Sequence, residues 1–144
     1  MFVTQRVPVS SYGGKEINMT KPILMALAGY FTLIAAALIV APLTFYQSIP
    51  GVSETGPFNS HFTRDVGFAF LVCAAGLFLG AWRRDRVLAL FGAAFPVLHA
   101  IFHVASWGHH AFPTHGVATF DLAVTVGPAA AGLFLALRIH RGAA

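Results

Sequence analysis

The stretch VLALFGAAFPVLHAIFHVASW, residues 87–107, decides the fold because it contains no Asp, Glu, Lys or Arg. An α-helix needs about 20 consecutive apolar residues to cross the hydrocarbon core of a bilayer, and this stretch is long enough. Three other stretches have similar length and character. We therefore predict four membrane-spanning helices, at about 22–44, 64–82, 87–107 and 116–138.

The composition of the whole chain supports a membrane protein. Of its 144 residues, 57% are hydrophobic and 10% are charged, whereas an ordinary soluble domain carries about 25% charged residues. We predict an all-α fold, a single transmembrane four-helix up-down-up-down bundle over residues 22–140, after a flexible tail over residues 1–21. A cleaved signal peptide is the rival interpretation of the first span, but its apolar region is usually shorter, about 7–15 residues.

Lys and Arg are distributed unevenly between the two ends of the predicted spans. They precede the first span, fill the turn between the second and third, and follow the fourth. The positive-inside rule then places both termini and the Arg-rich turn in the cytoplasm. The net charge of +4 indicates contact with anionic lipid rather than nucleic-acid binding, because the basic residues mark segment ends and form no single patch.

Histidines and aspartates gather at the opposite, predicted outer ends of the spans. His61 and Asp65 begin the second span, His99 and His103 lie inside the third, and Asp121 lies near the start of the fourth. Residues four apart share a helix face. Ionisable side chains are rare in hydrocarbon and usually face the bundle interior or a dedicated partner. We therefore expect these side chains to meet in the outer half of the bundle.

This set of donors suits a transition metal such as zinc, copper or iron, because imidazole and carboxylate bind all three. Two histidines at positions i and i+4 form a common ligand pair on a helix. Haem is the less favoured alternative, with His99 or His103 on one side of the iron and His61 or His115 on the other. The predicted metal-binding residues are His61, Asp65, His99, His103 and Asp121, with His110 and His115 as accessory ligands.

A purely structural role for the same residues stays open. His61 and Asp65 can form an interfacial pair at the start of a helix that Asn59 or Ser60 caps. The histidines of the third span can hydrogen-bond to an aspartate and hold the bundle together. Three further residues are predicted contacts for a substrate or an anion: Arg64, Asn59 and Tyr46.

The segments GPFNSHFTRDVG, residues 56–67, and LHAIFH, residues 98–103, resemble those of a group of small bacterial membrane proteins. That group pairs an Asn-x-His-Phe-x-Arg-Asp-x-Gly segment with a Leu-His-x-x-x-His segment, and its architecture is similar to that of DoxX-like four-helix proteins. The resemblance covers about residues 42–121. It implies the fold and a bacterial inner membrane but no reaction. The matching positions are Asn59, His61, Arg64, Asp65, His99 and His103.

Three classes of function follow from these patterns. The first is a metal-binding membrane protein, in its most concrete form a metal-dependent oxidoreductase. The second is a small ion or proton transporter, since chains of His and Asp relay protons in membranes; with so few spans it would require a homo-oligomer. The third is a non-catalytic subunit of a membrane complex. The sequence has no nucleophile triad, no phosphate-binding glycine loop and no recognisable iron–sulfur ligand set.

Overall fold

The computed structural model describes residues 19–107 and 115–139, and these residues form helices and connections but no strand. Four helical stretches are long and apolar enough to cross a membrane, which confirms the predicted class of fold. The first three are α1 (Thr20–Val40), α3 (Ser60–Arg83) and α4 (Arg86–Trp107). The fourth, Gly116–Leu137, is built from α5 (His115–Asp121), a π-helical turn η2 (Leu122–Val126) and α6 (Gly127–Leu137).

The connection between the first two spans is more ordered than the sequence analysis expected. It contains a short helix, α2 (Pro42–Ser48), and a 3₁₀ turn, η1 (Val52–Glu54). The first span ends at Val40 instead of residue 44, because Pro42 has no backbone N–H with which to continue α1. The second begins at Ser60 instead of residue 64, because the side chain of Asn59 caps its first turn.

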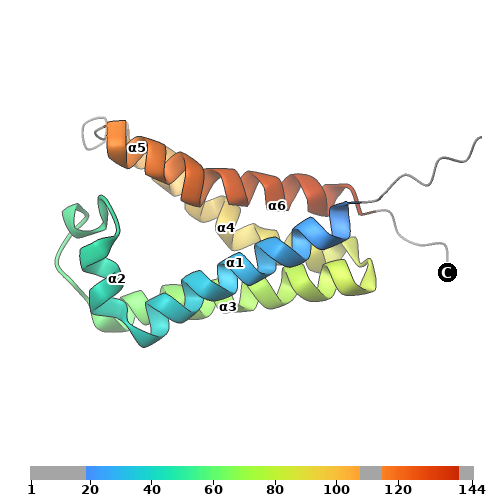
Figure 1. The fold of residues 1–144 in the computed structure, drawn as a ribbon, viewed down its shortest axis with the longest axis horizontal. Helices are drawn as coiled ribbons and strands as arrows, with labels where there is room; N and C mark the ends of the chain where they lie inside the picture. Colours follow the sequence, from blue (N-terminus) through green and yellow to red (C-terminus); the bar gives the residue numbers. More distant parts are fainter. Residues whose placement is uncertain (1–18, 108–114, 140–144) are drawn as a thin grey trace, which may run out of the picture.

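The two ends of the bundle differ. We call the end with α2 and the start of α3 the α2 end, and the end where α1 begins and α6 finishes the terminal end. Figure 1 shows α1 lying along α3, with the fourth span on the other side of the molecule. These two sides are close together at the terminal end and diverge toward the α2 end.

Glycines bring α3 and α4 into backbone contact. A methyl group added at Gly76 would lie 2.8 Å from the Cα of Gly92, and one added at Gly92 would lie 2.8 Å from the carbonyl oxygen of Cys73. Small residues of this kind let helices in lipid approach closely enough for van der Waals packing. Gly80 lies in the same contact, because a methyl group added there would lie 2.5 Å from the backbone nitrogen of Ala89.

The connection that contains α2 also contacts α5. Gly51 has a φ angle of 81°, in the left-handed region that glycine adopts without strain. A methyl group added there would lie 2.8 Å from Cγ1 of Val117. Val117 is one helical turn before Asp121, whose carboxylate is buried. The connection therefore packs beside the segment that carries Asp121.

Candidate functional site

The central polar contact of the molecule joins α4 to α5. His103 Nδ1 lies 3.0 Å from Asp121 Oδ2, and Asp121 is only 8% exposed. The indole Nε1 of Trp107 donates to the same carboxylate oxygen at 3.2 Å. Residues of two different spans therefore meet inside the bundle, as the sequence analysis predicted for His103 and Asp121.

His99 extends this cluster by one turn toward the middle of α4. Its ring centroid lies 4.6 Å from that of His103. On the other side, the His99 ring stacks on Phe95, with centroids 5.6 Å apart, and meets Phe70 edge-on at 5.5 Å. The polar cluster therefore extends from the α2 end into the bundle and ends at the rings of Phe70 and Phe95, which we call the aromatic floor. We call His99, His103, Trp107 and Asp121 the α4–α5 cluster.

The hydrogen bond to Asp121 has a consequence for the chemistry of His103. A neutral imidazole that donates from Nδ1 keeps the lone pair on Nε2, where it can accept a proton or bind a metal. The carboxylate of Asp121 is buried, and a buried charge is costly unless a charge of opposite sign compensates it. A proton on His103 and a metal ion at its Nε2 would each supply that positive charge.

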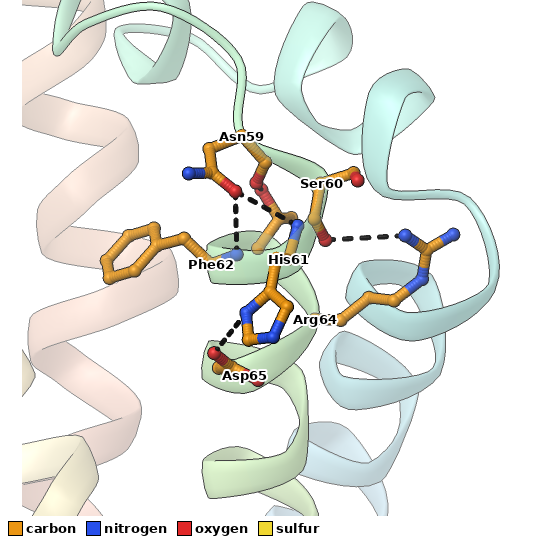
Figure 2. A network of polar contacts seen from close by, with 7 residues as sticks. Asn59, Ser60, His61, Phe62, Arg64 and Asp65 are labelled. Carbon is orange, nitrogen blue, oxygen red and sulfur yellow. Dashed lines mark hydrogen bonds and ion pairs between the residues drawn. The ribbon is translucent and has the colours of Figure 1, made fainter.

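His61 and Asp65 form a second, separate pair at the start of α3. His61 Nδ1 lies 2.8 Å from Asp65 Oδ2, with side chains 87% and 56% exposed; Figure 2 shows both on the surface of one helix. The sequence analysis expected Asp65 to meet the other ionisable side chains inside the bundle, but its side chain lies on the exposed face of α3. That expectation is wrong because Gly67 and Phe70 occupy the buried face of this part of α3.

The three predicted substrate contacts all bind backbone groups, and Figure 2 shows Asn59 and Arg64 doing so. Asn59 accepts hydrogen bonds from the amides of His61 and Phe62, each at 3.0 Å, and so caps α3 as predicted. Arg64 Nε donates to the carbonyl oxygen of Ile39 at 3.1 Å, in the last turn of α1. Tyr46, outside that view, donates its hydroxyl proton to the carbonyl of Gly56 at 2.7 Å and braces the α2 connection. Contact with a substrate stays a prediction for all three.

The five predicted metal ligands therefore fall into two groups. Among residues 19–107 and 115–139, no three side chains of His, Cys, Asp or Glu lie together in a way that could hold a metal ion. His99 and His103 approach Asp121, whereas His61 and Asp65 pair only with each other. His110 and the side chain of His115 lie outside the described part of the chain.

Two contributors to this region were missed. Trp107 is not among the predicted site residues, although its position four residues after His103 places it on the same helix face. The π-helical turn directly after Asp121 had a partial signal in Pro128, which cannot donate to the Val124 carbonyl four residues earlier. Turns of this type are often found at functional sites.

Comparisons with protein-family models, curated proteins and solved structures found no match to this chain. The fold and the α4–α5 cluster nevertheless define a class: over its described residues the protein is helical, with four helices able to span a membrane and a partly buried His–Asp contact between two of them.

Proposed function

We propose that this protein binds a transition-metal ion in the α4–α5 cluster, with His99 and His103 as ligands and Asp121 holding His103 in place. The observation that carries the proposal is the 3.0 Å contact between His103 Nδ1 and Asp121 Oδ2. Metal-binding histidines almost always donate their other ring N–H to a carboxylate, a carbonyl or water, which fixes the ring and increases its basicity.

The neighbouring groups support a cation at this place. His99 supplies a second imidazole one turn away on the same helix, a spacing typical of metal-binding pairs. The negative charge of Asp121 would offset the charge of the ion in a low-dielectric environment. With His99 and His103 as ligands, other coordination positions would stay open to water or a substrate, and an open position is what separates catalytic from structural metal sites. A metal-dependent oxidoreductase would additionally require copper or iron, because zinc has no redox chemistry.

The aromatic floor favours a binding site over a transporter. An ion that crossed the membrane here would have to pass His99 and then Phe70 and Phe95. Beyond them, α3 and α4 touch at Gly76 and Gly92. The distribution of Lys and Arg further supports a cluster that opens to the outside of a bacterial inner membrane.

A non-catalytic role as a subunit of a membrane complex is the second candidate. Asp121 already has two donors, His103 and Trp107, so its hydrogen bonds alone can hold α4 against α5. Such bonds typically contribute about 0.6–2 kcal/mol each in membrane bundles.

Elemental analysis of the purified, metal-loaded protein distinguishes these functions. We expect about one metal ion per chain, lost in His99→Ala and His103→Ala and retained in His61→Ala. His61 is the matched control because it lies at the same end but pairs only with Asp65. A Soret band would identify haem instead. A protein without metal, whose His99→Ala/His103→Ala variant folds normally, would contradict the proposal and support the structural role.

A further inference from the structure

A basic cavity lies at the terminal end of the bundle, far along the helices from the α4–α5 cluster. It encloses about 220 Å³ where the start of α1, the turn between α3 and α4 and the end of α6 converge. Its floor is apolar, with Leu24, Ala81 and Ile139 all buried. Three of the residues that line it are basic: Lys21, Arg84 and Arg138.

Each cation comes from a different helix end. Lys21 is in the first turn of α1, and its Nζ lies 4.9 Å from the ring centroid of Trp82. Arg138 caps the C-terminus of α6, with Cζ 4.1 Å from the ring centroid of Phe134. Arg84 caps the C-terminus of α3. The fold therefore brings three basic residues from different helix ends to the lining of one cavity.

Arg84 occupies a backbone position that suits glycine better. Its φ angle is 55°, and it is the one non-glycine residue with positive φ within the described ranges 19–107 and 115–139. Helices commonly end in this left-handed conformation, and glycine is the usual residue because it has no Cβ. The backbone alone does not explain an arginine here, whereas a role for its guanidinium group in the cavity does.

The three cations have no carboxylate partner among the described residues. The nearest acid in sequence is Asp85, whose Oδ1 accepts hydrogen bonds from the amides of Val87 and Leu88 at 2.9 and 3.1 Å. That carboxylate caps α4. The ion pairs of the described residues, His61 with Asp65 and His103 with Asp121, involve none of the cavity cations.

We propose that this cavity binds the phosphate group of an anionic membrane lipid. Arginine and lysine are the side chains that recognise phosphate. Basic pockets between transmembrane helices are known to hold lipid headgroups. The exposed indole of Trp82 beside Lys21 indicates headgroup depth, where tryptophan is enriched. The cavity is also smaller than the roughly 300–1,000 Å³ of typical small-molecule sites, which suits a headgroup whose acyl chains stay in the bilayer.

Calorimetric titration of the full chain in neutral detergent tests this proposal. The probes are short-chain phosphatidylglycerol, short-chain phosphatidylcholine and inorganic phosphate. We expect phosphatidylglycerol to bind at least about tenfold more tightly than either other probe. Lys21→Gln and Arg138→Gln should each weaken its binding about fivefold. The matched controls are Arg83→Gln and Arg86→Gln, which remove the same charge at the same turn without lining the cavity and should change binding less than about twofold.

Arg84→Gly separates binding from folding. Glycine relieves the left-handed backbone, so this variant should unfold at the same or a higher temperature than the unmodified protein while binding phosphatidylglycerol about fivefold more weakly. Equal weakening by all five variants would show diffuse attraction to the charged turn and overturn the proposal. If inorganic phosphate bound as tightly as phosphatidylglycerol, the cavity would recognise free phosphate rather than a lipid, and the proposal would be overturned. If none of the probes bound, the cavity would not be a binding site.

Discussion

Tyr30 donates its hydroxyl proton to the carbonyl oxygen of Val124 at 2.6 Å, which links the middle of α1 to the π-helical turn. In a regular α-helix that carbonyl would accept from the residue four positions later, but Pro128 has no N–H to offer. Within a bilayer there is no water to replace the missing donor. Tyr30 therefore supplies the hydrogen bond that Pro128 cannot donate to the Val124 carbonyl. This carbonyl lies in the turn directly after Asp121.

This relationship predicts a measurable loss in Tyr30→Phe. The variant should be less stable by about 0.6–1.7 kcal/mol, the range found for hydrogen bonds between membrane helices, as measured by unfolding in mixed detergent. Tyr46→Phe is the matched control, because its hydroxyl bonds within the exposed α2 connection. Adding Pro128→Ala to Tyr30→Phe should recover part of the loss. If the effects of the two changes were simply additive, the proposed coupling would be wrong.

The close crossing of α3 and α4 predicts that Gly92→Ala is severely destabilising. Its new methyl group would lie 2.7 Å from the carbonyl carbon of Gly76, and neither backbone can move aside cheaply. Overpacking typically costs 1–3 kcal/mol, and we expect about 3 kcal/mol here. Gly29→Ala is the control, since a methyl group there meets no atom within 4 Å and should be neutral or stabilising. Equal thermal stability of the two variants would refute the crossing.

The amino-acid sequence predicts the helices well because apolar length is a local property. The four spans needed no knowledge of distant residues. The composition of the site was only partly predictable. Spacing along α4 placed His99 and His103 on one face, but it could not show that the divergence of α3 from α5 leaves Asp65 with His61.

Contacts across the bundle were the least predictable. Tyr30 and Val124 are 94 residues apart, and no periodicity in either span indicates that they meet. Similarly, Arg64, a predicted contact for a substrate or an anion, donates to a carbonyl at the end of α1, which stops shortly before Pro42. In the first case Pro128 leaves the Val124 carbonyl without its regular donor, and in the second the Ile39 carbonyl lies in the last turn of α1, where helical donors run out. The sequence does not show which side chain replaces the missing donor.

The two roles proposed for Asp121 predict different results for Asp121→Asn and Trp107→Phe. Asparagine retains an acceptor oxygen but no charge, so metal affinity should fall about 10–100-fold with a modest loss of stability. Trp107→Phe removes the indole donor from Asp121, which should cost about 1 kcal/mol of stability and change metal affinity much less. Metal titration and unfolding of both variants are the measurements. Similar metal affinity in both would exclude a special role for the carboxylate charge.

The contact of Arg64 with α1 predicts a structural role that can be separated from substrate binding. Arg64→Met keeps most of the length of the side chain but removes the donor to the Ile39 carbonyl. Because that carbonyl lies in the last turn of α1, where a positive charge also favours the helix dipole, we expect a loss of about 1–2 kcal/mol in the stability of the bundle. Arg64→Lys keeps the charge but lacks the guanidinium geometry, so it should recover only part of the loss.

Asp65→Asn, at the next position on the exposed side of the helix, is the control and should change stability by less than about 0.5 kcal/mol. Thermal unfolding of the three variants measures these effects, and full stability of Arg64→Met would show that the contact with Ile39 does not hold α1 against α3.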